Sequence, residues 1–555
     1  MRRLTDFFAN RLFRSRYLLA VISGLVLAMA FPLPGIPGMA WVAPGMMVAA
    51  GFGRSGAESF RIGYVAGLAF YLASLYWLLL IPYRWLGIPF GPAAGWLALG
   101  AYLAVYPAVW VWLMTRFAPE TWSQRAAWAL FGGIAWVGLE MVVARLFSGF
   151  PWNLLGTSQY KLTPLIQIAS VTGVYGVSFL LVWTSLGLFS AARTMLRNPV
   201  QRSTWAGEAI LPLLAVAIVF NLGLRQVRSV PVPPEKVIRV ALVQPSIPQT
   251  LIWDSGSSDE RFAELLRLSR QAATNRVDLL VWPEAAVPKL LRYDAPTFEA
   301  VTGLAREHRL WMIIGADDAE PKQGAEGKQE NEYSNSSFLI SPEGKLVERY
   351  RKRNLVIFGE YIPLARWLPF LKWFTPIDGG FTPGDRVVPF EMPDLGATTA
   401  VLICFEDVFP WCAREAATTN TQFLLNLTND GWFGESAAQW QHAISGLFRT
   451  VENNIPLVRS CNNGLTCWID ERGRIRQMFR NEAGSPYAPG VMHFELPIRS
   501  AAEAGARTFY NRHGDLFGWS CFALTALMVA VKLRSGRDRK EGAQQGSMPA
   551  DAEKK

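Results

Sequence analysis

The stretch TTAVLICFED, residues 398–407, decides the fold of the second half of the chain. Residues 400–403 form a continuous apolar run rather than an alternating one, which is typical of a strand buried on both faces. The run ends at Cys404, and the acidic residues Glu406 and Asp407 follow closely. Proteins with buried parallel strands commonly carry reactive groups where such strands end. Cys404 is therefore a candidate nucleophile, although a cysteine in this position is more often a small packing residue.

Six further stretches share this strand's short length and β-branched content, and segments with helical spacing separate them. We expect these strands at residues 237–244, 277–283, 311–316, 334–341, 422–428 and 457–462. Residues 259–274 and 436–454 carry apolar side chains at the spacing of an amphipathic helix. The alternation of strands and helices predicts an α/β domain with a sheet covered on its faces.

The chain upstream of this domain is far more apolar. Hydrophobic residues make up 51% of the 555 residues and charged residues only 18%, and the apolar residues concentrate before this domain. A helix that crosses a bilayer needs about 20 apolar residues. We therefore predict an α-helical transmembrane bundle of about eight spans, at residues 17–34, 38–53, 62–82, 90–115, 126–147, 165–191, 207–224 and 515–532.

Basic residues are distributed unevenly between the loops of this bundle. The N-terminus, alternate loops and the C-terminal tail hold most of them, for example Arg14, Arg61, Arg125, Arg197 and Arg537. The positive-inside rule therefore predicts that both termini lie in the cytoplasm and that the α/β domain lies outside. A cleaved N-terminal signal peptide is the alternative interpretation of the basic start.

The expected domains are the first seven transmembrane helices at 1–228, the α/β domain at 229–510, an eighth helix at 511–534 and a disordered cytoplasmic tail at 535–555. Membrane topology also accounts for the net charge of +10, since no basic stripe alternates with base-stacking aromatics. We therefore expect no nucleic-acid partner. The five cysteines show no CxxC spacing and no cluster with histidine, so no metal or other cofactor is expected.

Two more polar residues accompany Cys404. Glu284 follows the apolar run that ends in Trp-Pro, and Lys352 lies in the segment YRKRNLVIFGEYIP, residues 350–363. Considered alone, the glutamate is typical of a turn, and the lysine is typical of a solvated surface charge. Together, Glu284 could accept the thiol proton, and Lys352 could stabilise the thiolate and a tetrahedral oxyanion. None of the four histidines follows a strand in this way, which disfavours a Cys–His pair.

The order of these motifs resembles the Glu–Lys–Cys triad of the nitrilase superfamily, and more closely its membrane-embedded branch, the bacterial apolipoprotein N-acyltransferases. The similar segments are QPSIPQTLIWD (244–254), LVWPEAAVP (280–288), KRNLVIFGEYIP (352–363), ICFED (403–407), LTNDGWFGES (427–436) and RSCNNGLTCWID (459–470). The resemblance implies a nitrilase-like αββα sandwich attached to a transmembrane bundle in the bacterial inner membrane, with the catalytic domain on the periplasmic side.

The resemblance also implies a ping-pong reaction. Cys404 would take an acyl chain from a membrane phospholipid as a thioester, then pass it to the α-amino group of the diacylglyceryl-cysteine that begins an apolipoprotein. Membrane lipids would be further partners. Glu284 is then the general base and Lys352 the oxyanion stabiliser. Residues that match supporting positions are Glu360, Phe405 and Glu406, and those that match substrate-handling positions are Trp253, Asn429 and Trp432.

The chain departs from the family's pattern at two places, without touching the triad. Residues 354–357 read Asn-Leu-Val-Ile where the family often has His-Leu-Val-Pro, and Phe405 stands where tyrosine is common. Two other functions stay open on the residues alone. One is a membrane-tethered amidase that hydrolyses its thioester with water, and the other is a transporter with an inert α/β domain.

Overall fold

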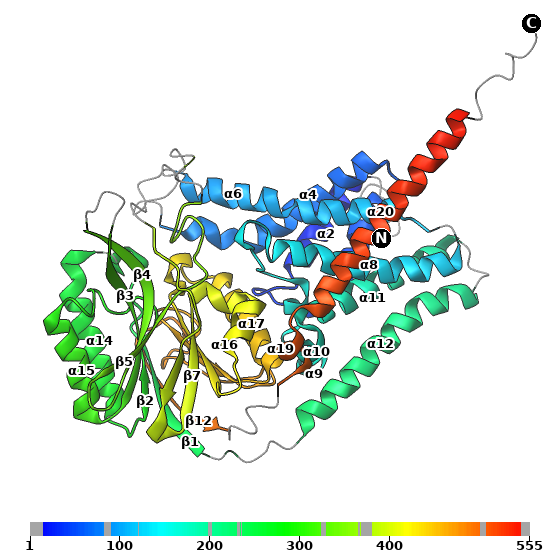
Figure 1. Cartoon of the computed structure of the whole chain (residues 1–555). Coiled ribbons are helices and arrows are strands. Elements are labelled where there is room, and N and C mark those ends of the chain that lie inside the picture. The colour runs from blue at the N-terminus through cyan, green and yellow to red at the C-terminus, as the bar shows by residue number, and fades with distance from the viewer. Residues whose placement is uncertain are drawn as a thin grey trace, which may run out of the picture.

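The computed structural model describes residues 15–82, 90–119, 121–197, 202–229, 234, 236–252, 254–323, 329–363, 367, 380–499 and 507–545. A helical region formed mainly by the first half of the chain packs beside an α/β domain formed by the second (Figure 1). The last helix, α20 (Leu516–Gln545), returns to the helical region. It covers residues 535–545 of the predicted tail, and residues 546–555 lie outside the described part.

The α/β domain contains two six-stranded sheets. The first has the order β12-β1-β2-β3-β4-β5, with parallel pairing at β1–β2 and β2–β3 and antiparallel pairing elsewhere. Its strands are β1 (Lys236–Gln244), β2 (Leu279–Val281), β3 (Trp311–Gln323), β4 (Gln329–Ile340), β5 (Leu346–Arg351) and β12 (Gly490–Ile498).

The second sheet has the order β11-β10-β9-β8-β7-β6, and its parallel pairs are β7–β8 and β8–β9. Its strands are β6 (Pro389–Met392), β7 (Ala397–Ile403), β8 (Phe423–Thr428), β9 (Leu457–Cys461), β10 (Cys467–Ile469) and β11 (Ile475–Met478). All seven predicted strands are present. Five others, β5, β6, β10, β11 and β12, were not expected as strands, because they are short or carry polar side chains that hide the period.

Three apolar cores define the layers. One core lies between the sheets and joins residues such as Val240 and Val281 to Val401 and Leu425. A second lies between the first sheet and the outer helices α14 (Ser258–Ala273) and α15 (Ala295–His308). The arrangement is an αββα sandwich, which confirms the predicted fold class (Figure 1).

The third core unites the sandwich with the helical region. Residues of β7 and β8 and of the covering helices α16 (Pro410–Ala416) and α17 (Ala437–Asn453) belong to the same buried cluster as the helices of the first half. α16 and α17 therefore pack between the second sheet and the helical region (Figure 1). Because this core is continuous, the second sheet and everything it carries are positioned partly by the helical region.

Five helices in the described part are long and apolar enough to cross a membrane, at residues 91–116, 123–143, 174–196, 206–228 and 516–534. The first of them is interrupted at Ala104, between α6 (Gly91–Leu103) and α7 (Val105–Arg116). The others lie within α8 (Trp122–Val143), α11 (Val174–Arg197), α12 (Arg202–Arg228) and α20.

The predicted count of about eight spans is not confirmed. α2 (Arg16–Ala28) and α3 (Ala43–Gly51) are shorter than a bilayer crossing, and short turns of helix precede α11 where the sequence suggested one continuous span. α4 (Gly56–Ser74) completes the helical region. α12 and α20 present many exposed leucine, isoleucine and valine side chains, which suits helices that face lipid.

Candidate active site

Cys404 lies immediately after β7, at the first position of a short helical turn, η8 (Cys404–Val408). Its φ is +51°, in the left-handed region that non-glycine residues rarely adopt. Such strain persists only where surrounding contacts hold the backbone, and it is common at reactive residues. The strand therefore ends in a sharp turn that presents the cysteine side chain, as the sequence predicted for the end of a buried strand.

Glu406 holds this turn through buried hydrogen bonds. Its carboxylate accepts from the backbone N–H of Ile403 at 2.7 Å, of Arg353 at 2.8 Å and of Asn354 at 3.1 Å, and from the Tyr350 hydroxyl at 3.0 Å. Burial raises the pKa of Glu406. The residue ties the turn to the chain that follows β5, so its contacts fit the supporting place that the sequence assigned to it.

Glu284 lies two residues beyond Trp282 after β2 and is 7% exposed. Its carboxylate accepts hydrogen bonds from Asn335 Nδ2 at 2.7 Å and from the backbone N–H of Asn429 at 2.9 Å. The nearby Cys404 side chain acts to lower the pKa of this carboxylate. Burial raises the pKa of Glu284, and the nearby Lys352 opposes that rise. A carboxylate with a raised pKa beside a thiol is suited to act as a general base.

Lys352 follows β5 and is 1% exposed. Its Nζ donates to Glu360 Oε1 at 2.9 Å and lies 3.5 Å from Glu284 Oε1. Burial acts to lower the pKa of Lys352, but Glu360 and Glu284 raise it above its usual range, so the amine stays protonated. The other Glu360 oxygen accepts from the backbone N–H of Val356 at 2.8 Å. Glu360 thus anchors the lysine between two carboxylates.

The thiol itself is neutral at rest. Desolvation and the Glu284 carboxylate raise the pKa of Cys404 well above its usual range, despite the opposing charge of Lys352. The proton must therefore leave when the thiol attacks, and the carboxylate of Glu284 is nearby to receive it. The structure brings Glu284, Lys352, Glu360 and Cys404 together, as the sequence predicted, in an arrangement able to form and break an acyl thioester.

Gly315 allows the backbone of Glu284 to come this close to β3. A Cβ at residue 315 would lie 2.3 Å from the carbonyl oxygen of Pro283 and 2.7 Å from Glu284 Cα. We expect Gly315→Ala to shift Glu284 and lower activity by about 10- to 100-fold, measured as the rate of product formation. Gly303→Ala is the matched control, because its Cβ would have no atom closer than 4.0 Å. Equal activity of the two variants would contradict this role.

Phe405 joins the nucleophile turn to the helical region. Its ring centroid lies 6.0 Å from that of Trp152 and 6.1 Å from that of Phe150, in the loop after α8, and 4.9 Å from that of Phe409. This aromatic contact replaces any hydroxyl contact that a tyrosine would make here. The residue beside the nucleophile therefore touches the helical region directly.

The predicted substrate-handling residues have different surroundings. Asn429 donates its side-chain amide to Gln249 at 2.8 Å, and its side-chain oxygen accepts from Asn462 at 2.9 Å, so the contacts of its side chain lie within the protein. Trp432 is partly exposed in the turn η9 (Asp430–Phe433) beyond β8. Trp253 lies outside the described residues. Substrate contact by these three residues stays a prediction.

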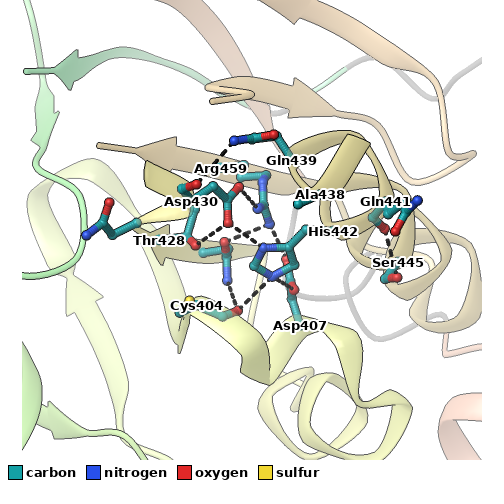
Figure 2. Close-up of polar contacts among 12 residues, drawn as sticks. Cys404, Asp407, Thr428, Asp430, Ala438, Gln439, Gln441, His442, Ser445 and Arg459 are labelled. Carbon is teal, nitrogen blue, oxygen red and sulfur yellow. Dashed lines mark hydrogen bonds and ion pairs between the residues drawn. The ribbon is translucent and has the colours of Figure 1, made fainter. Parts of the chain in front are cut away.

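A buried charge network beside Cys404 was not anticipated from the sequence (Figure 2). His442 Nδ1 lies 2.7 Å from Asp430 Oδ1, and His442 Nε2 lies 2.8 Å from Asp407 Oδ1 and 3.2 Å from the Cys404 carbonyl oxygen. Arg459 Nη2 lies 2.9 Å from Asp430 Oδ2, and Arg459 Nη1 binds Asp407 Oδ2 at 2.5 Å. The negative charges of the two carboxylates thus balance the positive charges of His442 and Arg459 inside the domain.

Both ring nitrogens of His442 face oxygen acceptors, so the ring is held as an imidazolium. Burial and Arg459 act to lower the pKa of His442, but Asp407 and Asp430 raise it to about 9. Such an imidazolium cannot serve as the base for Cys404. The sequence disfavoured a Cys–His pair but missed the histidine's contact with the cysteine backbone.

This network predicts a loss of stability in alkaline solution. Because the pKa of His442 is raised from about 6.5 in an unfolded chain to about 9 in the folded one, its charge stabilises the fold fully below pH ~6.5 and progressively less as the pH rises through about 9. We expect the unfolding temperature to fall between pH ~6.5 and about 9, and to fall less in His442→Asn. Parallel pH profiles of the two proteins would contradict this assignment.

A second acid near the triad was also missed. Burial, followed by Glu284 and Glu360, raises the pKa of Asp317 in β3 to about 7. Its register partner on β4 is Asn335, whose amide donates to Glu284 and, at 3.0 Å, to Glu360. Both residues lie on long polar strand ends, where the sequence offers no apolar run to mark a buried site.

Two family models match successive parts of the chain. The family model described as Carbon-nitrogen hydrolase matches residues 239–483, and that described as Apolipoprotein N-acyltransferase N-terminal domain matches residues 23–187. Among solved structures, an amidase from Nesterenkonia sp. is 19% identical, with a TM-score of 0.34, and the match covers 50% of this chain and 95% of the amidase.

Two curated relatives match nearly the whole chain. An apolipoprotein N-acyltransferase of Geobacter metallireducens is 38% identical, and the match covers 96% of this chain and 98% of the relative. One of Haemophilus influenzae is 28% identical, with 94% and 95% covered. With both domain models matched in order and this identity over almost its full length, the chain belongs to the apolipoprotein N-acyltransferase family of membrane acyltransferases.

Proposed function

We propose that this acyltransferase moves a fatty acyl chain from a membrane phospholipid to the amino group of the diacylglyceryl-cysteine that begins an apolipoprotein. The observation that carries the proposal is the buried cluster at Cys404, in which the Glu284 carboxylate lies 3.5 Å from Lys352 Nζ and both charges act on the thiol. Catalysis by Glu284, Lys352 and Cys404 is part of the proposal. The aromatic contact of Phe405 with the helical region supports a lipid donor, because it joins the site to the membrane part.

In the first half-reaction, Glu284 removes the Cys404 proton as the sulfur attacks the ester carbonyl of the phospholipid. Lys352 and the backbone N–H of Phe405 stabilise the tetrahedral oxyanion. The carbon–oxygen bond then breaks, Glu284 returns its proton to the departing oxygen, and a lysophospholipid leaves. Cys404 retains the acyl group as a thioester.

In the second half-reaction, the acceptor amine attacks the thioester carbonyl while Glu284 takes a proton from its nitrogen. Collapse of the tetrahedral intermediate breaks the carbon–sulfur bond and forms the amide. The sulfur leaves as a thiolate beside Lys352 and recovers its proton from Glu284. The enzyme returns to its starting state, with no cofactor required.

The test uses the full chain in phospholipid nanodiscs with a diacylglyceryl-cysteine peptide. We expect mass spectrometry to detect the N-acylated peptide and, when the peptide is omitted, an acyl adduct on the intact protein. Release of free fatty acid without peptide acylation would indicate a membrane-tethered amidase or hydrolase instead. No adduct with any phospholipid would overturn the thioester mechanism.

We also propose that the protein resides in the bacterial inner membrane with its catalytic domain on the periplasmic side. The basic residues at the N-terminus, such as Arg14, and in the C-terminal part of α20, such as Arg537, support cytoplasmic termini. A reporter enzyme active only in the cytoplasm, fused after residue 555, should be active. Activity of a periplasm-specific reporter at the same place would contradict this orientation.

A further inference from the structure

Gln441 on α17 connects the catalytic domain to the helical region through five hydrogen bonds. Its Oε1 accepts from Trp77 Nε1 at 3.0 Å, Trp152 Nε1 at 2.7 Å and Asn153 Nδ2 at 3.3 Å. Its Nε2 donates to the carbonyl oxygens of Pro32 at 2.9 Å and Ser74 at 3.1 Å. All five partners belong to the helical region, and the residue is 3% exposed. The amide has no hydrogen-bonding capacity left.

The next residue on the same helix, His442, reaches the nucleophile turn. Its Nε2 lies 3.2 Å from the Cys404 carbonyl oxygen, which also accepts from Asn426 Nδ2 at 3.0 Å. Adjacent residues on a helix point in directions about 100° apart, so one residue faces the helical region and the other faces the sheet (Figure 2). Cys404 needs such support because its φ is positive.

Trp152 closes a ring of contacts between these two residues and the turn. Its indole N–H binds Gln441, its ring centroid lies 5.4 Å from that of His442, and it packs on Phe405 beside the nucleophile. Through Trp152, the loop after α8 therefore contacts Phe405 in the nucleophile turn, His442, which binds that turn, and Gln441, which binds the loop. A displaced loop would disturb all three contacts.

We propose that His442 is a positioning residue for Cys404 and that Gln441 makes this positioning depend on the docked helical region. His442 donates to the Cys404 carbonyl and so holds the turn that aims the thiol at Glu284. Gln441 fixes the start of α17 and the Trp152 loop against each other. The helical region thus contributes to the reactivity of the nucleophile in addition to holding lipid. The inference deepens the proposed function and rests on it.

Two substitutions of His442 separate positioning from simple stabilisation. Both His442→Gln and His442→Asn remove the same charge, so both should destabilise the domain to a similar extent. Glutamine can place an amide N–H near the position of Nε2, within reach of the Cys404 carbonyl. The shorter asparagine can place its amide only near the position of Nδ1, which faces Asp430. We expect His442→Asn to lower kcat by about 30-fold with KM for the peptide unchanged, and His442→Gln to lose at most about 5-fold.

Gln441→Met tests the connection to the helical region, because methionine has a similar volume but offers neither the amide N–H groups nor the carbonyl oxygen. We expect it to lower kcat by about 10-fold or more. His493→Asn is the control, because His493 donates a comparable hydrogen bond to the Ala272 carbonyl at 2.9 Å. His493 lies on β12, the edge strand of the first sheet, whereas the Cys404 turn follows β7 of the second sheet. Its kcat should match that of the unmodified protein.

The rate of Cys404 alkylation by chloroacetamide gives a second measurement that needs neither lipid nor peptide. The other four cysteines are buried, and Cys404→Ser supplies the blank. We expect alkylation to slow in His442→Asn and in Gln441→Met but much less in His442→Gln. Equal slowing in the two His442 variants would overturn the positioning role, and normal alkylation and kcat in Gln441→Met would overturn the link to the helical region.

These outcomes are distinguishable from a failure of the proposed function. If the function is wrong, the unmodified protein forms no N-acylated peptide, yet the alkylation rates still order the variants. If only the positioning role is wrong, the unmodified protein transfers acyl chains. The kcat values of the two His442 variants then decrease equally, in step with their unfolding temperatures.

Discussion

Cys404→Ser is expected to lower acyl transfer by at least about 10³-fold while leaving the fold intact. Serine fits the same turn, but its hydroxyl is a far weaker acid than a thiol. Glu284 can receive a proton from the nearby Cys404 thiol. A carboxylate is too weak a base to activate the serine hydroxyl without further help. The measurement is the initial rate of N-acylated peptide formation in phospholipid nanodiscs, together with the intact mass of the protein.

Cys412→Ser is the matched control for this substitution. Cys412 lies on α16, eight residues from Cys404, and is fully buried in the core shared with the helical region. It should keep the acyl adduct and most of the transfer rate, with some loss of thermal stability. A Cys404→Ser protein that retains a tenth of the activity, or an adduct that persists in it, would remove Cys404 from the mechanism.

The cluster of Glu284, Lys352 and Cys404 could be predicted from the sequence because two of its members follow buried apolar runs. Glu284 comes after β2 and Cys404 after β7, and each is marked by an apolar run that ends abruptly. Lys352 was harder to find, since β5 carries several polar side chains and reads as a basic surface segment. Its identification needed the order of all three motifs, and its burial became evident only in the folded domain.

His442 could not be predicted in the same way. It lies in the middle of α17, where its neighbours in sequence are helical and mostly buried. Its role depends on Asp407, Asp430 and Arg459, which come from three other segments and meet only after the sheets form. A pattern within one helix contains no information about such partners. The single available signal was an ionisable residue on an otherwise well-packed helix face.

The predicted number of membrane spans is not confirmed, for a related reason. Hydropathy registers apolar composition, but it does not distinguish a crossing from a short helix that packs inside a bundle. α3 has nine residues and is almost entirely buried, so its apolar character reflects contact with other helices. α12 and α20 also contain long apolar stretches, but these are mostly exposed, which fits contact with lipid. Burial, which the sequence does not provide, separates the two cases.

Lys352→Met is expected to lower both activity and stability strongly. The substitution leaves Glu284 and Glu360 buried without their shared cation, and removal of one partner from a buried ion pair costs about 3–5 kcal/mol. The pKa of Glu284, already raised by burial, should rise further once the opposing charge of Lys352 is gone. We expect transfer to fall by about 10³-fold, because the oxyanion also loses its donor.

The loss of stability should depend on pH in a defined direction. A carboxyl group whose pKa is raised in the folded protein favours the fold at low pH, and this benefit is lost as the pH rises through that pKa. The unfolding temperature of Lys352→Met should therefore increase as the pH is lowered from 8 to 6, relative to the unmodified protein. An unchanged difference across this range would mean that the two carboxylates are not left unpaired.

The double variant Lys352→Met/Glu360→Gln separates the structural role of the lysine from its chemical one. Neutralising Glu360 removes the second buried carboxylate, so much of the lost thermal stability should return. Activity should not return, because the double variant still lacks a cation for the oxyanion and the departing thiolate. Recovery of acyl transfer together with stability would show that Lys352 only neutralises its neighbours, and that another group carries the charge of the transition state.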